Sequence, residues 1–286
     1  MGPLGSGAVP GLYRLGTARE TRAMTKTSDR TVLRLTGADT RDFLQGLITN
    51  DMARAKGALL YAALLNPQGK YLADFFVLDR GEDVLIDVAT PFAAGLAQRL
   101  SMYRLRAKVA IETTDLTVAR GTGPAPEGAL PDPRHPALGW RAYGATRGSD
   151  DTDWTALRVA LCLPETGIEL IPNDTYILEA GFERLHGVDF RKGCYVGQEV
   201  TARMKHKTDL RKGLVTVTVE GAAPPGTEIT ADGRPAGTLF TQAGGRAIAH
   251  LRFDRAGGPM QAGTARVLWD GADPATPGAV PRPSSG

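Results

Sequence analysis

The residues best suited to chemistry lie in one stretch, residues 191–203, with the sequence RKGCYVGQEVTAR. It places one of only two cysteines, Cys194, between two glycines, with a basic pair just before them. Residues 198–204 favour a helix, so Cys194 should lie on or just before its first turn. The positive end of that helix, Arg191 and Lys192 would all favour a thiolate. The stretch predicts a reactive or ligand-binding thiol at the rim of a site. A small buried residue in a tight turn is the alternative.

A second candidate is Asp74, in the segment YLADFF at residues 71–76. Strand alternation puts Leu72, Asp74 and Phe76 on one face, and a carboxylate among apolar neighbours needs a basic partner or a ligand. The other cysteine, Cys162, falls in an apolar stretch and is predicted to be part of the core. The four histidines lack metal-ligand spacing, and no nucleotide-binding or hydrolase motif occurs.

The composition sets wider limits on function. A length of 286 residues suits roughly two or three compact units, and 42% hydrophobic with 23% charged residues is ordinary for a globular protein. A net charge of +3 suits an anionic ligand but is too small to indicate nucleic acid. Two cysteines indicate a reducing compartment rather than a disulfide framework. They are also too few to carry an iron–sulfur cluster unaided, since a cluster takes about four ligands.

The elements that must position these residues follow from the hydrophobic periodicity. The first part predicts the order β-α-β-β-β-α-β, an α+β pattern of mostly antiparallel hairpins. Its expected strands are 32–35, 58–65, 70–78, 83–88 and 106–113, and its helices begin near 39 and 92. Next come strands at 116–120 and 140–143 around a loop with no assignable chemistry, and helices at 153–163, 176–185 and 199–205. Strands at 214–219, 235–241, 246–253 and 264–269 predict a small all-β unit.

These patterns divide the chain into five segments. Residues 1–23 are expected to be an unstructured leader, the remnant of an expression tag, with Gly/Arg-rich upstream sequence or a transit-like peptide as the alternatives. Residues 24–114 form the N-terminal α+β domain, 115–210 a middle α+β segment, and 211–270 the all-β unit. Residues 271–286 are rich in Pro, Ala, Gly and Ser and are expected to be disordered.

The segment KGCYVGQE at residues 192–199 resembles the signature K-G-C-[FY]-x-G-Q-E of the YgfZ family. That family is the folate-binding, iron–sulfur-maintenance branch of the superfamily that includes the glycine cleavage T-protein, the aminomethyltransferase GcvT. Weaker matches flank the segment in the expected order at 43–51, 65–75 and 167–172, and the resemblance spans about 31–269. It implies a GcvT-like α+β fold of three parts around a central folate-binding opening, with the all-β unit as a C-terminal β-barrel.

The resemblance also implies tetrahydrofolate, or a folate derivative, as the cofactor. A pterin edge donates N–H groups to carboxylates, its ring stacks on aromatic side chains, and a glutamate tail pairs with Lys or Arg. The candidates are Asp51, Asp74 and Glu169 for the edge, Tyr103 and Tyr195 for stacking, and Lys70, Arg104, Arg106 and Arg203 for the tail. Lys192, Gly193, Gln198 and Glu199 of the motif complete the binding set. Cys194 and Asp74 are the expected catalytic residues, and no metal site is expected.

Two functions follow. The first is an accessory protein that uses tetrahydrofolate and Cys194 to support assembly or repair of iron–sulfur clusters in client enzymes; the motif cysteine favours it. The second is a folate-dependent methyl or aminomethyl transferase acting on protein or tRNA. Asp74 is compatible with this second function, although the T-protein has an Asp-Asp pair where this chain has Ala73-Asp74. The cysteine is a nucleophile, a transient iron ligand or a one-carbon acceptor.

The expected partners are folate and, transiently, iron–sulfur assembly or client proteins. We expect the protein to be a monomer. We also expect no membrane segment, because no apolar run approaches the ~20 residues of a spanning helix. Nucleic acid is not an expected partner, apart from tRNA under the second function. The expected location is the cytoplasm, or the mitochondrial matrix if residues 1–23 are a transit peptide.

Overall fold

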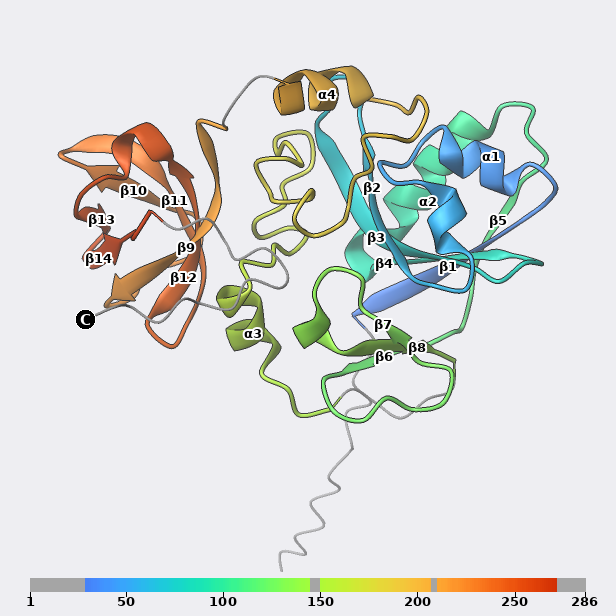
Figure 1. Ribbon diagram of the computed structural model, residues 1–286, viewed down its shortest axis with the longest axis horizontal. Coiled ribbons are helices and arrows are strands. Elements are labelled where there is room, and N and C mark those ends of the chain that lie inside the picture. The colour runs from blue at the N-terminus through green and yellow to red at the C-terminus, as the bar shows by residue number, and fades with distance from the viewer. Residues whose placement is uncertain (1–28, 145–149, 207–209, 272–286) are drawn as a thin grey trace, which may run out of the picture.

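The computed structural model describes residues 29–144, 150–206 and 210–271, which fold into an N-terminal sheet layer, a middle segment and a barrel (Figure 1). The expected leader at 1–23 and the expected tail from residue 272 onward lie outside the described residues. Among the residues described, no helix is both long and apolar enough to cross a membrane.

The N-terminal part has the predicted element order. Its elements are β1 (Arg30–Thr36), α1 (Thr40–Gln45), the 3-10 helix η1 (Met52–Ala55), β2 (Leu60–Leu65), β3 (Tyr71–Asp79), β4 (Val84–Ala89), α2 (Thr90–Arg104) and β5 (Ala110–Thr113). The strands form one antiparallel sheet in the order β2-β3-β4-β1-β5. Every residue of β2 and β3 is buried, because both faces of the sheet are covered.

A β-bulge corrects one expectation about the face of Asp74. Leu64 pairs with Ala73, but the next residue, Leu65, pairs with Tyr71, so the register shifts by one. The extra residue interrupts the alternation. As a result Leu72 packs into the core on the α2 side, and the Tyr71 side chain shares the face of Asp74 instead.

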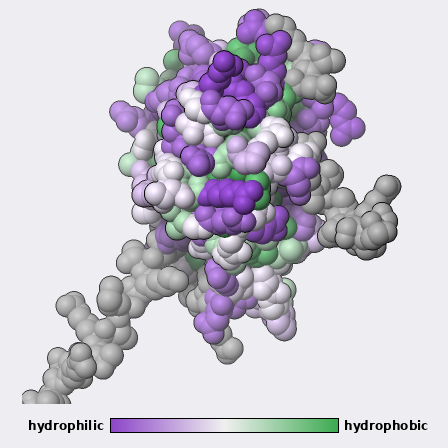
Figure 2. Space-filling view, turned by 90° about the vertical axis from the view of Figure 1, so that its left-hand side faces the viewer, coloured by the Kyte–Doolittle hydropathy of each residue, from purple (hydrophilic) through white to green (hydrophobic). Residues whose placement is uncertain are grey.

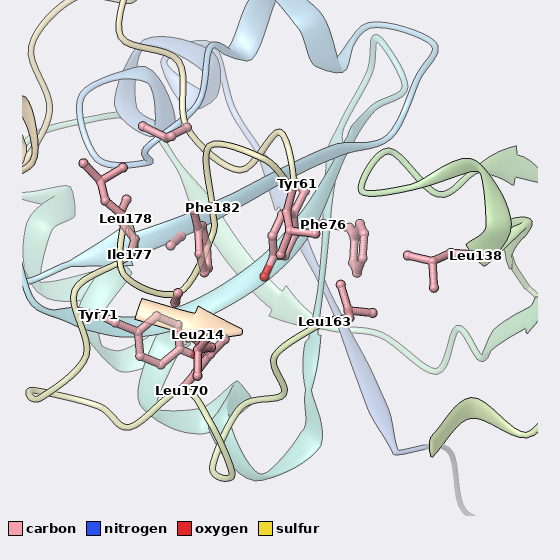
Figure 3. Close-up of a cluster of buried hydrophobic side chains, with 14 of the residues drawn as sticks. Tyr61, Tyr71, Phe76, Leu138, Leu163, Leu170, Ile177, Leu178, Phe182 and Leu214 are labelled. Atoms are coloured by element: carbon pink, nitrogen blue, oxygen red, sulfur yellow. The ribbon is translucent and has the colours of Figure 1, made fainter. Parts of the chain in front are cut away.

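The middle segment contains β6 (Val118–Gly121), β7 (Leu130–Pro131), η2 (Pro136–Leu138), β8 (Trp140–Tyr143), α3 (Trp154–Ala160) and α4 (Gln198–His206), with a small sheet in the order β6-β8-β7. The expected helix at 176–185 is wrong. That segment is a series of turns, because Gly181 has a φ of +78° and breaks the helical hydrogen-bond ladder. Its apolar residues are still buried; Phe182 stacks on Tyr61, which also contacts Phe76 (Figure 3).

The C-terminal part is a closed antiparallel barrel in the order β10-β11-β12-β9-β14-β13. Its strands are β9 (Lys212–Glu220), β10 (Thr227–Ala231), β11 (Arg234–Ala243), β12 (Arg246–Arg252), β13 (Met260–Ala262) and β14 (Ala265–Leu268), with η3 (Phe253–Arg255) between them. Alternate residues such as Val215, Val217 and Val219 point inward and fill it. The outer surface at this end is mainly hydrophilic or neutral, with hydrophobic residues in small areas (Figure 2).

Candidate functional site

Asp74 is the buried acid of β3, and three hydroxyl groups surround it. The hydroxyl of Tyr61 donates to its Oδ2 at 3.0 Å and that of Tyr71 to its Oδ1 at 2.7 Å. Thr166 Oγ1 also donates to Oδ1. Burial and the Asp74 charge raise the pKa of both tyrosines, so they remain donors. The carboxylate is therefore held in a fixed orientation.

Asp74 lies in the wall of a cavity of about 200 Å³ between the sheet and the middle segment. Strand ends and the start of α2 form one side, and α3 with the loop after it forms the other. The charged lining residues are Asp29, Arg30, Asp74, Arg120, Arg134, Arg141, Arg158 and Glu165; Phe92, Trp154, Leu163 and Thr166 are among the others. Five arginines around one buried aspartate give this cavity both donors and an acceptor for a polar ligand.

The arginines are fixed by buried carboxylates behind them. Asp87 accepts from Arg30 at 2.6 Å and from Arg141 at 3.1 Å. Asp132 pairs with Arg134 at 2.8 Å and with Arg141 at 3.1 Å. Burial opposes ionisation of Asp87 and Asp132, but the arginines outweigh it and hold the pKa of both acids below the usual range. The network stays charged and orders the cavity wall.

Trp154 adds an unsatisfied donor to the same wall. Its indole lines the cavity, and among the described residues its buried Nε1–H has no hydrogen-bond partner. The guanidinium of Arg120 lies 4.4 Å from the ring centroid. A buried donor without an acceptor is costly, so the indole would gain from a ligand oxygen.

The cysteine motif forms a separate feature, docked on the turn between β2 and β3. Gly197 has a φ of +82°, and a β-carbon there would lie 2.5 Å from the Asn66 carbonyl oxygen. Gly69, at a φ of +75°, faces it, and a β-carbon on Gly69 would lie 2.7 Å from Val200 Cβ. Two glycines therefore let the motif backbone contact the hairpin turn directly.

Lys192 ties the other side of the motif to α1. Its Nζ donates to the carbonyl oxygens of Gln45 at 2.8 Å and Ile48, at the carboxyl end of that helix. Burial lowers the pKa of Lys192 to about 8, against the raising effect of Asp51 and Asp189. Tyr195 is buried, and Gln198 Oε1 accepts from its backbone N–H at 3.2 Å.

Cys194 is an exposed residue, four positions before α4. It therefore does not lie on the first helical turn, and it is not among the residues lining the Asp74 cavity. Chain neighbours aside, no atom of the described part of the chain lies within 4 Å of the position that a β-carbon on the adjacent Gly193 would take. Cys162, by contrast, is a core residue as predicted, and burial raises the pKa of its thiol to about 11.

Glu169 is buried, and its carboxylate bonds to residues of both the middle segment and the barrel. Its carboxylate pairs with Arg158 at 2.7 Å and accepts from the Thr241 hydroxyl of β11 at 2.5 Å. This contact links α3 to the barrel. Glu169 is not in the cavity lining but contacts it through two residues that are, the Arg158 guanidinium and the Glu165 backbone N–H.

The remaining predicted binding residues also lie outside the cavity lining. Asp51 caps η1 by accepting from the Ala53 N–H. The Lys70 ammonium donates to the Asp174 carbonyl and lies 3.6 Å from the centroid of the Tyr176 ring. Tyr103, Arg104 and Arg106 sit at the carboxyl end of α2, and Glu199 and Arg203 are exposed on α4. Of the site residues predicted from the sequence, Asp74 alone is among the residues that line the cavity.

Sequence reasoning missed most of the cavity wall, namely Arg30, Arg120, Arg134, Arg141, Trp154 and Thr166. Arg134 comes from the loop at 121–139, to which no chemistry was assigned. The only signal in the sequence was that Asp132 and Arg134 flank a proline, a few residues before the strand that carries Arg141.

Comparisons with known proteins agree with this architecture. The GCVT N-terminal domain model matches residues 16–128, and the CAF17 C-terminal beta-barrel domain model matches residues 211–275. The solved aminomethyltransferase T of the glycine cleavage system from Bartonella henselae superposes with a TM-score of 0.68 at 13% identity, over 84% of this chain and 82% of that one. The fold and barrel thus define a protein of the GcvT superfamily.

Sequence relatives narrow this class. The mitochondrial iron–sulfur cluster assembly factor IBA57 of Mus musculus is 31% identical over 278 residues, covering 81% of this chain and 78% of the relative. The human protein is 29% identical, covering 85% and 81%. A homologue from Mycosarcoma maydis is 31% identical, but this chain spans only 59% of its length. The chain belongs to the family of the iron–sulfur cluster assembly factor IBA57, with a barrel of the CAF17 type. The narrower resemblance to YgfZ stays a prediction.

Proposed function

We propose that this protein supports the assembly or repair of iron–sulfur clusters in client enzymes, as a YgfZ-like member of its family. The observation that carries the proposal is Cys194, an exposed thiol on a loop fixed by Gly197 and Lys192. The names of the IBA57 relatives describe the same kind of role. A thiol held on an ordered loop and open to solvent suits contact with a second protein.

In this account Cys194 is a transient ligand or acceptor for the cluster, which is cargo. A cluster takes about four protein ligands, and the chain has two cysteines, of which Cys162 is buried. A client or carrier protein would therefore supply the other ligands. Within the described residues, no group of three or more His, Cys, Asp or Glu is arranged to hold a metal ion.

The same proposal assigns the Asp74 cavity to tetrahydrofolate or a derivative. The donor set fits a reduced pterin: Asp74 accepts from ring N–H groups, the unsatisfied Trp154 N–H donates to a ring oxygen, and Phe92 offers apolar contact. A volume of about 200 Å³ suits the pterin head, while complete small-molecule sites span about 300–1,000 Å³. The glutamate tail of the folate would extend out of the cavity past the arginines that line it. When bound, folate supplies one-carbon carrier chemistry.

Within the cavity, the chain's own residues bind and orient. The three hydroxyls on Asp74 fix the acceptor, and the carboxylates behind Arg30, Arg134 and Arg141 fix the donors. Such preorganisation lowers the cost of ordering side chains on binding. In this proposal Arg30, Arg134 and Arg141 replace the residues expected from the sequence to bind the tail, Lys70, Arg104, Arg106 and Arg203.

The test is complementation of a deletion strain, scored on the activities of iron–sulfur enzymes. Cys194→Ala should fail to restore them, while Cys162→Ala, which removes the buried thiol, should restore them in proportion to the folded protein present. Loss with Asp74→Ala but full activity with Cys194→Ala would contradict the proposal. That pattern would support the second candidate, a folate-dependent methyl or aminomethyl transferase acting on protein or tRNA, which the retained cavity aspartate favours.

The proposed partners are folate and, transiently, assembly or client proteins, with the protein itself a monomer. The proposed boundaries remain 24–114, 115–210 and 211–270. The relatives are named as mitochondrial proteins. For this chain we propose the mitochondrial matrix if residues 1–23 are a transit peptide, and the cytoplasm otherwise.

A further inference from the structure

The turn after α2 presents an unusual leucine. Leu105 has a φ of +45° and a ψ of −105°, and the Arg104 carbonyl accepts from the Ala107 N–H at 2.8 Å. These values describe a β-turn of type II′, in which the first central residue is normally glycine. A leucine is strained there, and its side chain is 89% exposed. Neither the turn nor the core accounts for a leucine at this position.

The turn is held firmly on both sides. The Arg104 guanidinium donates to the Val109 carbonyl at 3.1 Å, and the Lys108 backbone N–H donates to the Asp39 carboxylate at 2.7 Å. Met102, one helical turn before Leu105, is 70% exposed. Two large apolar side chains therefore project from a rigid support, which is the arrangement of an anchor in a protein interface.

The surroundings of this anchor are basic. Arg99, Arg104, Arg106 and Lys108 are all exposed, residues 99–111 contain no acid, and the half-buried Asp39 carboxylate on the Lys108 N–H is a single acid beside four basic residues. A rim of this kind steers an acidic surface into contact and selects against basic ones. The patch is too small for a lipid surface, since the other exposed residues on this part of α2, Ala94, Gly95, Gln98 and Ser101, lack large apolar groups.

We propose that Met102, Leu105 and the basic residues Arg99, Arg104, Arg106 and Lys108 form a docking surface for an acidic protein with an apolar pocket. None of these six residues lines the cavity around Asp74. The surface is therefore distinct from the proposed folate site, and the proposal does not depend on which function proves correct.

A photo-activated benzoyl-phenylalanine placed at position 102, in cells of the organism that encodes the chain, should cross-link an acidic protein. The control carries the same probe at Asp232, an exposed residue in a turn of the barrel. Asp232 has a positive φ, as Leu105 does, so it also provides the matched control for a substitution by glycine. The captured protein is then purified and titrated with the wild type and with three variants. Leu105→Gly and Arg106→Glu should each weaken binding at least about tenfold, whereas Asp232→Gly should leave it unchanged.

Thermal unfolding separates binding from folding, because Leu105→Gly relieves the strained turn. Its melting temperature should equal or exceed that of the wild type. Four results would overturn the proposal: no cross-link above the control, a captured protein whose affinity Leu105→Gly leaves unchanged, a lower melting temperature for Leu105→Gly, or Leu105-dependent sedimentation with phosphatidylglycerol vesicles. The last would make the surface a lipid contact.

Discussion

Gly197 and Gly69 pack backbone against backbone: a β-carbon on Gly197 would lie 3.1 Å from the Gly69 α-carbon. The two residues are far apart in sequence, and each has a positive φ. This contact joins the cysteine motif to the turn between β2 and β3. It explains the second glycine of KGCYVGQE as a structural requirement, distinct from the chemistry of the thiol.

Gly197→Ala should destabilise the protein by about 1–3 kcal/mol from backbone strain, with a further cost from the clash with the Asn66 carbonyl. Gly193→Ala is the matched control in the same motif, because no described residue other than its chain neighbours lies within 4 Å of its β-carbon position. Chemical denaturation of both variants measures the difference. Equal stability of the two would show that the docked turn does not constrain the loop.

The buried pair Glu169–Arg158 should matter more for stability than the outer pair Glu165–Arg158. Glu169→Gln leaves a buried guanidinium without its inner partner and should cost about 3 kcal/mol of unfolding free energy. Glu165 is half exposed, so Glu165→Gln should cost less than about 1 kcal/mol. If the two variants unfold at the same denaturant concentration, Glu169 does not join α3 to the barrel as described.

The two cysteines should differ in reactivity. In native protein at pH 8, an aromatic disulfide reagent should modify one thiol rapidly, and Cys194→Ser should abolish that phase. Cys162 should react only after unfolding, because burial excludes the reagent and raises the pKa of the thiol to about 11. Two rapid thiols, or none in the wild type, would contradict the exposed placement of Cys194.

The N-terminal element order and the barrel followed from the sequence because hairpins and alternating strands are local patterns. The cavity could not follow in the same way. Arg30 and Arg134 are about one hundred positions apart, and buried Asp87 and Asp132 bring them to one wall. The motif glycine could be recognised, but its partner at Gly69 depends on the docking of two distant turns. The side of the sheet on which Leu72 lies depends on a β-bulge, and no pattern of residues in the sequence predicts that bulge.

Lys192 should make stability depend on alkaline pH. Burial lowers its pKa from the ordinary 10.5 to about 8, so between these values the unfolded chain binds a proton that the folded chain has released. The unfolding free energy contributed by this group therefore rises as pH increases through that window. From pH 8 to 10.5 the unfolding free energy of the wild type should therefore rise relative to that of Lys192→Met. A shift in the opposite direction would mean that the fold prefers the charged amine.

Calorimetric titration with tetrahydrofolate tests most directly whether the cavity over Asp74 accepts a reduced pterin. The wild type should bind with measurable heat, and Asp74→Asn, which loses the anionic acceptor, should bind at least about tenfold more weakly. Asp51→Asn, which lies outside the cavity lining, should bind like the wild type. An absence of heat at millimolar ligand, or equal affinity of the wild type and Asp74→Asn, would contradict the assignment of this cavity to folate.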